Sequence, residues 1–258
     1  MKILALDSSG LVASVAYMED DTLVAEYSTN YKKTHSQTLL PMLDEIRKMV
    51  ELDLSGVDVI AVAAGPGSFT GLRIGSATAK GLGLALGAKL AAVPTVDALA
   101  MNLYGCDKLI CPVMDARRSQ VYTGLYTFEK QDGSYALHAQ LTQCALPVQE
   151  LAGKINETGR EVIFLGDGVP VYRNVFKELL QVPYSFAPAS CNRQRAASVA
   201  VLGAEYAKAG KLVGADAFAP EYLRMSQAER ERMEANEAER ERMKAGITPG
   251  SAEGKKNG

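Results

Sequence analysis

The chain has 258 residues, of which 47% are apolar and 22% are charged, and its formal net charge is −2. This length is enough for one large domain or for two lobes that each bury a core. The slightly acidic balance argues against a dedicated nucleic-acid binder, because phosphate contacts need a basic excess. Any action on RNA is therefore expected to pass through a more basic partner.

The N-terminal residues run directly into a strand-like pattern, without the apolar core and cleavage site of a signal peptide. No apolar run approaches the roughly 20 residues that span a membrane. The four cysteines show neither CxxC pairs nor metal-ligand spacing, which favours free thiols in a reducing compartment. We expect a cytoplasmic protein without a membrane contact.

The first hundred residues alternate between strand-like and helical patterns. Short apolar runs predict strands, and apolar residues at helical spacing predict helices. In chain order we expect strands over 2–6, 12–18 and 23–29, a helix over 36–52, a strand over 57–64, a helix over 69–86, a strand over 90–93 and a helix over 95–103.

The pattern then begins again. We expect strands over 109–114, 120–128 and 135–142, a helix from Pro147, a strand over 162–165, a helix from near Pro170, and a last helix reaching about residue 208 that Ser190 or Asn192 would cap. Both halves therefore follow the order β-β-β-α-β-α. This order is typical of the actin-like, ribonuclease H-like class of duplicated α/β folds.

The predicted organisation has three parts: an N-terminal lobe of residues 1–104, a reduced C-terminal lobe of residues 105–225, and a charged tail of residues 226–258. In the tail, the six residues 228–233 return as 238–243, with glutamate and arginine at helical spacing. Such pairs support a solvated helix. A coiled-coil partner is the alternative, and the final residues are expected to be disordered.

A glycine-rich loop, Gly-Pro-Gly-Ser-Phe-Thr-Gly, occupies residues 65–71 between a predicted strand and helix. It lacks the lysine of a P-loop and the glycine spacing of a dinucleotide fingerprint. Phosphate binding at the helix start and a plain tight turn both remain open. It also lacks the Gly-x-Ser-x-Gly elbow of a serine hydrolase.

The helix after this loop carries small residues at every fourth position. Glycine inside a helix is unfavourable by about 1 kcal/mol relative to alanine, so several on one face need a compensating role. Close packing on the chain's own sheet and an intermolecular helix–helix interface are both open. The ridge consists of Gly71, Gly75, Ala79, Gly83 and Gly87.

Two predicted hairpins carry polar residues suited to anions. Asp7, Ser8 and Ser9 follow the first strand, where a carboxylate could order a metal-bound water and hydroxyls could contact phosphate; a simple turn is the alternative. In the second half, residues 116–118 read Ala-Arg-Arg where an ATP clamp would need glycine. The only histidines, His35 and His138, stand far apart in the sequence, so no metal site is predicted.

Residues 65–75, Gly-Pro-Gly-Ser-Phe-Thr-Gly-Leu-Arg-Ile-Gly, resemble the signature of the TsaB family, paralogues of the threonylcarbamoyl transferase subunit TsaD. Four further motifs resemble this family in the same order, and the resemblance covers residues 1 to about 228. These motifs are Leu-Asp-Ser-Ser at 6–9, His-Ser-Gln-Thr-Leu-Leu-Pro at 35–41, Asp-Ala-Arg-Arg at 115–118 and Pro-Glu-Tyr-Leu-Arg at 220–224.

The resemblance implies an actin-like subunit that has no catalytic residues of its own. It would dock with TsaD and support threonylcarbamoyl transfer to the adenosine beside the anticodon of ANN-decoding tRNAs. A TsaE-like ATPase is the third implied partner, with ATP or ADP and Mg²⁺ at a subunit interface. The residues expected at the TsaD interface are His35, Leu39, Leu43, Gly71, Arg73, Gly75, Ala79 and Gly83.

Two other functions remain open at this point. The first is a self-sufficient actin-like ATPase or small-molecule kinase, using Asp7, Ser8 and Ser9 together with an adenosine-side loop at Gly166-Asp167-Gly168. The second is a homodimeric binding module, since a ridge of small residues serves a second copy as readily as a different partner.

Overall fold

The computed structural model describes residues 1–224, 232, 237 and 241. The chain divides into two compact units, Met1–Leu223 and Arg224–Gly258. The predicted charged helix and disordered end at residues 226–258 lie outside the described residues, apart from three single positions. None of the helices in the described part has the length and apolar character that a membrane crossing requires.

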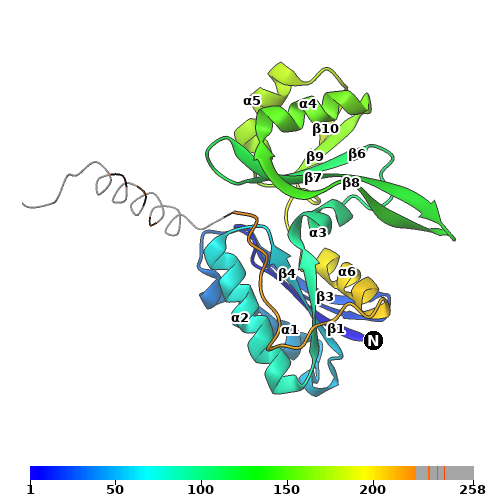
Figure 1. Cartoon of the computed structure of the whole chain (residues 1–258). Helices are drawn as coiled ribbons and strands as arrows, with labels where there is room; N and C mark the ends of the chain where they lie inside the picture. The colour runs from blue at the N-terminus through cyan, green and yellow to red at the C-terminus, as the bar shows by residue number, and fades with distance from the viewer. Residues whose placement is uncertain (225–231, 233–236, 238–240, 242–258) are drawn as a thin grey trace, which may run out of the picture. The chain divides into compact units, whose positions relative to one another are not determined.

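The first sheet is built mainly from the N-terminal third of the chain (Figure 1). Its strand order is β3-β2-β1-β4-β5, with β1 antiparallel to β2 and parallel to β4. The strands are β1 (Lys2–Asp7), β2 (Ala13–Glu19), β3 (Thr22–Thr29), β4 (Val59–Gly65) and β5 (Lys89–Pro94). Because β1 and β4 are buried on both faces, they read as continuous apolar runs rather than as alternating ones.

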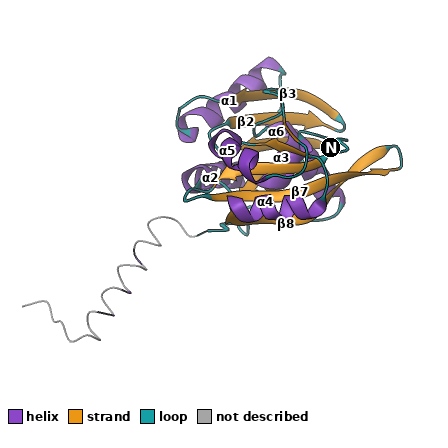
Figure 2. Cartoon of the chain, turned by 90° about the horizontal axis from the view of Figure 1, so that it is seen from above, coloured by secondary structure: helices purple, strands orange, loops and turns teal. Residues whose placement is uncertain are grey.

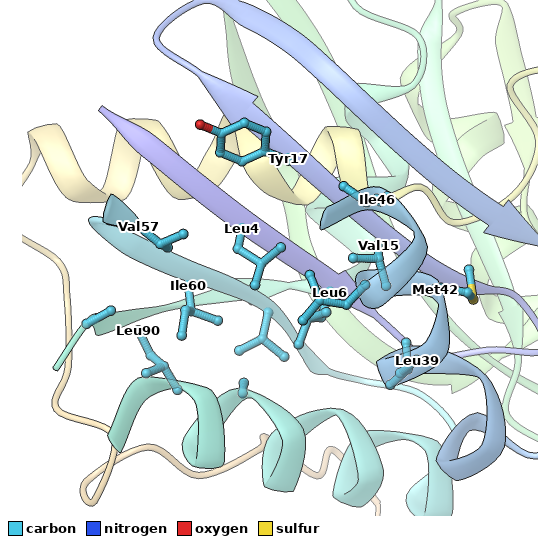
Figure 3. Close-up of a cluster of buried hydrophobic side chains, with 14 of the residues drawn as sticks. Leu4, Leu6, Val15, Tyr17, Leu39, Met42, Ile46, Val57, Ile60 and Leu90 are labelled. Atoms are coloured by element: carbon cyan, nitrogen blue, oxygen red, sulfur yellow. The ribbon is translucent and has the colours of Figure 1, made fainter. Parts of the chain in front are cut away.

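Successive side chains of β1 serve two different cores. Leu4 and Leu6 pack with residues of α1 (His35–Met49) and α2 (Phe69–Leu86), as Figure 3 shows around Leu39 and Met42. The alternate residues, Ile3 and Ala5, pack with α3 (Thr95–Met101) and α6 (Ala196–Lys208). The two-residue period of a strand therefore divides its side chains between two layers of helices.

The second sheet repeats this arrangement. Its order is β10-β9-β6-β7-β8, in which β6 has the central place that β1 has in the first sheet. The strands are β6 (Leu109–Asp115), β7 (Gln120–Gln131), β8 (Ser134–Pro147), β9 (Val162–Leu165) and β10 (Tyr184–Phe186), with helices α4 (Val148–Thr158) and α5 (Val169–Leu179). Figure 2 shows the strands and helices of both halves from above. The predicted duplicated β-β-β-α-β-α order is confirmed.

Two short elements were not predicted: β10, which has three residues, and the 3₁₀ turn Leu54–Gly56. The predicted cap of the last helix was wrong. Helix α6 begins at Ala196, beyond Ser190 and Asn192, and its first N–H groups are bonded by side chains of the first sheet. A boundary at residue 105 thus separates the two sheets, but α6 lies after that boundary and packs on the first sheet.

Candidate functional site

The glycine loop packs against the first hairpin. The Ser9 carbonyl accepts the Ser68 N–H at 2.7 Å, and the Ser68 side chain caps α2 by accepting the Gly71 N–H at 3.3 Å. A Cβ on Gly67 would lie 2.3 Å from the Ser9 carbonyl oxygen. Only glycine therefore permits this approach of loop and hairpin.

The hydrogen-bonding groups of Asp7, Ser8 and Ser9 are directed into the protein. The three residues are at most 3% exposed. Asp7 Oδ1 accepts the Ser9 N–H at 2.9 Å and the Ser9 hydroxyl at 2.7 Å, while the Ser8 hydroxyl donates to the Gly71 carbonyl at 2.9 Å. Burial raises the pKa of Asp7, although the Ser9 bonds oppose the shift. In this arrangement the hydroxyl donors are already used within the protein, and burial disfavours the charged carboxylate that would order a metal-bound water.

The predicted glycine ridge faces the chain's own core. Gly71, Gly75, Ala79 and Gly83 are all buried. A Cβ on Gly71 would lie 2.1 Å from the Ser8 carbonyl oxygen, one on Gly75 would lie 2.4 Å from Ser8 Oγ, and one on Gly83 would lie 2.6 Å from Leu90 Cδ1. The intramolecular alternative is thus the one that the structure supports, and these four residues are not available as a docking surface.

The three interface residues expected on α1 are also turned inward. Leu39 and Leu43 are 1% and 4% exposed and belong to the first core. His35 Nε2 lies 2.9 Å from the Gly10 carbonyl oxygen and links α1 to the first hairpin. Of the eight expected interface residues only Arg73 is exposed, and its guanidinium lies over the Phe69 ring at 4.0 Å.

The exposed face of α2 carries a second ridge of small residues, which was not predicted from the sequence. Ala77, Gly81 and Ala85 are exposed and follow Arg73 at the same four-residue spacing. A Cβ on Gly81 would meet nothing within 4 Å, and the neighbouring Leu84 is 69% exposed. We call residues 73, 77, 81, 84 and 85 the outer ridge. The signal for it was present in the sequence as the same period, offset by two residues.

The segment 211–223 returns along α2 to the glycine loop. Lys80 Nζ donates to the carbonyls of Asp216 and Phe218, and the Glu221 N–H donates to the Ala64 carbonyl at 2.7 Å. The Tyr222 ring lies 4.8 Å from that of Phe69. The motif at residues 220–224 thus fixes the start of α2 from outside, and we call residues 211–223 the C-terminal strap.

The second hairpin has an unusual backbone. Arg117, Arg118 and Ser119 have φ values of 66°, 55° and 56°, in the left-handed region that favours glycine. The glycines of the supposed adenosine loop serve packing instead, since a Cβ on Gly166 would lie 2.2 Å from the Val113 carbonyl oxygen. Burial raises the pKa of the adjacent Asp167, with Arg193 opposing the shift.

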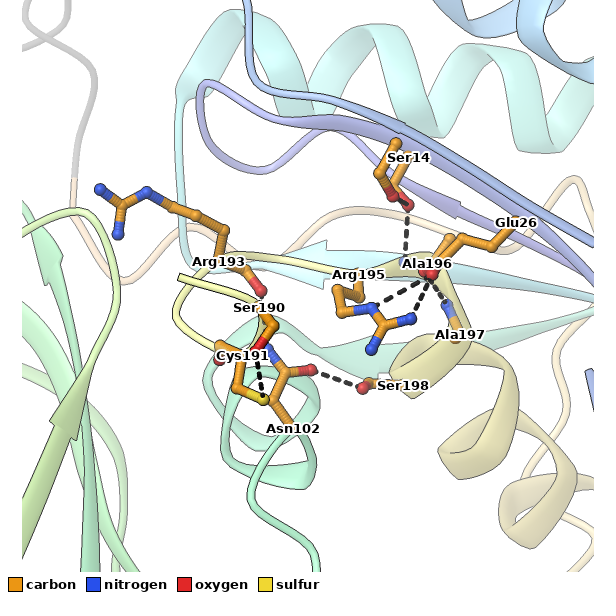
Figure 4. Close-up of polar contacts among 11 residues, drawn as sticks. Ser14, Glu26, Asn102, Ser190, Cys191, Arg193, Arg195, Ala196, Ala197 and Ser198 are labelled. Atoms are coloured by element: carbon orange, nitrogen blue, oxygen red, sulfur yellow. Dashed lines mark hydrogen bonds and ion pairs between the residues drawn. The ribbon is translucent and has the colours of Figure 1, made fainter. Parts of the chain in front are cut away.

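A polar cluster surrounds the start of α6 (Figure 4). The Ala196 N–H donates to Ser14 Oγ at 2.9 Å, and the Ala197 N–H donates to Glu26 Oε1 at 3.1 Å. The other oxygen of Glu26 pairs with the Arg195 guanidinium. A pocket of about 410 Å³ lies beside this cluster and is lined mainly by polar residues of β3, of the residue after it and of the 189–195 segment.

A second set of hydrogen bonds near the start of α6 is made by Asn102. Its amide donates to the carbonyls of Cys191 at 3.1 Å and Arg193 at 2.6 Å, and accepts the Ser198 hydroxyl at 2.7 Å. Asn102 lies at the end of α3, where the chain first leaves the N-terminal lobe. The two segments that connect the lobes are therefore bonded to each other.

Within the described residues, no group of three or more His, Cys, Asp and Glu side chains is placed to hold a metal ion. His35 bonds to the first hairpin, whereas the exposed His138 lies 3.3 Å from a Glu129 carboxylate oxygen on β7. The structure does not bring the two histidines together.

Comparison with known proteins identifies the family. A family model described as "TsaD: tRNA N6-adenosine threonylcarbamoyltransferase" matches residues 22–232. The Bacillus subtilis tRNA threonylcarbamoyladenosine biosynthesis protein TsaB is 33% identical over 91% of this chain and 99% of its own length. The Escherichia coli TsaB is 29% identical over 69% of this chain and 76% of its own length.

Among solved structures, YeaZ from Pseudomonas aeruginosa matches with a TM-score of 0.72 and 28% sequence identity. The match covers 86% of this chain and 99% of that one. The fold is actin-like, as the strand orders of the two sheets indicate. The sequence matches extend through both lobes, and on this evidence the chain belongs to the TsaB family.

Proposed function

We propose that this chain is the non-catalytic partner of a TsaD-like subunit in the synthesis of threonylcarbamoyladenosine beside the anticodon of tRNA. The observation that carries the proposal is the 33% identity to a TsaB protein over nearly the whole of that relative. The chemistry is assigned to the partner, and this chain provides a rigid docking surface. We place the complex in the cytoplasm, with a TsaE-like ATPase as a third component.

The arrangement of both hairpins supports a role without catalysis by this chain. Asp7, Ser8 and Ser9 are bonded within the first hairpin, and the second hairpin carries two arginines where a phosphate clamp needs glycine. A nucleotide at a subunit interface belongs to the same proposal. We derive no step through it, because the hydroxyl donors of Ser8 and Ser9 are already used within the protein.

The outer ridge of α2 is the surface that best suits a partner helix. Small side chains at positions 77, 81 and 85 let a second backbone approach closely, as ridge-and-groove packing requires. Leu84 would gain burial on docking, which contributes roughly 1.5–3 kcal/mol for a fully buried leucine. Helix α1, which packs beside α2, adds the exposed Leu40 and Met49.

Two substitutions of one residue test this docking surface. Gly81→Arg places a long charged side chain on the outer ridge, and we expect it to abolish co-elution with the TsaD-like subunit in size-exclusion chromatography. Gly81→Ala is the matched control, because a Cβ there meets nothing. Normal association of Gly81→Arg would refute this docking surface.

The cellular assay is restoration of the modified nucleoside in cells depleted of their own TsaB. Wild type and Gly81→Ala should restore it and Gly81→Arg should not. A chain that self-associates, ignores the TsaD-like subunit and restores nothing would be a homodimeric binding module, and the proposed function would be wrong.

A further inference from the structure

The turn between β6 and β7 holds three consecutive non-glycine residues in the left-handed conformation. For Arg117, Arg118 and Ser119 this backbone is unfavourable, because Cβ crowds the following carbonyl oxygen. Such strain persists only where the surroundings fix it, and it clusters at functional sites. Glycine would adopt the same turn without strain, so the side chains themselves need an explanation.

Hydrogen bonds involving residues of β6, α4 and α5 hold the turn in place. Asp115 Oδ1 accepts the Arg117 N–H at 2.9 Å and the Tyr172 hydroxyl at 2.9 Å. The Tyr172 hydroxyl also lies 3.2 Å from the Gln120 carbonyl oxygen, and the Ser119 carbonyl accepts the Val148 N–H at 3.0 Å. Helices α4 and α5 thus fix a turn whose tip they leave uncovered.

The tip carries more positive than negative charge. The Arg117 side chain is 87% exposed although one of its nitrogens lies 3.2 Å from Asp115 Oδ2. Arg118 is exposed, and it makes no hydrogen bond or ion pair within the described part of the chain. Glu150, the acidic residue in the first turn of α4, pairs with Lys154 at 3.5 Å. One guanidinium is therefore presented on a rigid turn without a carboxylate of its own.

We propose that the Arg117–Ser119 turn contacts a backbone phosphate of the tRNA when this chain is part of its complex. The inference rests on the proposed function, which makes an RNA the substrate of the assembly. A guanidinium presents a planar fork of donors that matches phosphate geometry, and preorganisation reduces the entropy lost on binding. The formal net charge of −2 gives RNA no overall attraction to the chain, so a phosphate contact depends on a local, rigid cation.

The test compares Arg118→Gln with wild type in tRNA titrations at several salt concentrations, using a fluorescent unmodified ANN-decoding tRNA and the complex with the TsaD-like subunit. We expect about tenfold weaker binding for the variant, as for a lost charge-assisted hydrogen bond. The slope of log K against log salt should fall in magnitude by about 1. Lys130→Gln, an exposed charge at the opposite end of β7, is the matched control and should change neither value.

A second variant separates charge from folding. Arg118→Gly removes the same charge but relieves the left-handed strain, so it should weaken tRNA binding while the thermal midpoint stays the same or rises. Unchanged affinity and slope in both variants would overturn the proposal. It would also be overturned if either variant weakened association with the TsaD-like subunit instead, because the turn would then be a protein contact.

Failure of the proposed function is recognised separately by size-exclusion chromatography of the wild-type mixture. If no complex forms, the same titrations are made on the isolated chain. There a slope equal in wild type and Arg118→Gln would reject the phosphate contact, and a reduced slope in the variant would retain it.

Discussion

Replacing Gly75 by alanine tests how closely α2 approaches the first hairpin. Alanine is favoured over glycine inside a helix by about 1 kcal/mol. At Gly75, however, the new Cβ would lie 2.4 Å from Ser8 Oγ, which donates to the Gly71 carbonyl. Turning this hydroxyl away leaves a polar group unpaired at a residue only 3% exposed, which costs about 1–3 kcal/mol. The net effect is a loss of up to about 2 kcal/mol.

The assay is a set of thermal or urea unfolding curves on four variants. Gly81→Ala has the same helix-propensity gain without a clash, so it should be about 1–3 kcal/mol more stable than Gly75→Ala. This gap corresponds to about 2–4 °C in midpoint for each kcal/mol. In a Ser8→Ala background the next atoms around the Gly75 Cβ lie 3.8 and 3.9 Å away, so Gly75→Ala should there be stabilising. Equal effects of Gly75→Ala in both backgrounds would refute the reasoning.

Three further predictions concern buried and half-buried polar groups. Asp7→Asn keeps an acceptor for both Ser9 donors and should raise the stability at neutral pH. Because burial raises the pKa of Asp7 in the folded state, the wild type loses stability as the pH rises through that pKa. The stability advantage of the variant should therefore vanish in acid. Tyr172→Phe should remove part of the stability loss in base, since the pKa of Tyr172 is raised from 10.0 to about 12 and the wild type therefore loses stability between these values. Unfolding curves from about pH 9 to pH 12 check this. Asn102→Ala should lower stability by about 2–3 kcal/mol and speed amide exchange over residues 191–193, and unchanged exchange would contradict the tie between the two connections.

Local signals predicted much of the fold. The helix at 69–86 and the strand at 162–165 agree with the structure at both ends, because a capping serine, a following glycine and short apolar runs mark them in the sequence. The start of α6 could not be found in this way. Its acceptors, Ser14 and Glu26, lie 182 and 171 residues away in the sequence from the N–H groups that they bind, and no local residue marks them.

The main error in the predicted site concerned which face of α2 is turned toward the core. Two sets of residues in α2 follow the same four-residue period: 71, 75, 79 and 83, and 73, 77, 81 and 85. The period alone therefore cannot show which set faces the core. The inward set is the one that meets Ser8 and Leu90, and these contacts exist only after the sheet has formed. The left-handed backbone of the second hairpin was equally invisible, because arginine and serine do not ordinarily indicate a positive φ.

The position of α6 and of the C-terminal strap has a consequence for how the protein is made. On a ribosome, the first five strands emerge long before α6, which covers one face of their sheet, and before the C-terminal strap, which fixes the start of α2. Until then Ile3, Ala5 and Ala61 lack the helix that buries them. Gly203 of that helix must later pack so closely against the Ala61 side chain that a Cβ on residue 203 would clash with it. The N-terminal lobe therefore completes its folding only when nearly the whole described chain has been synthesised, and a fragment ending at residue 104 should not fold by itself.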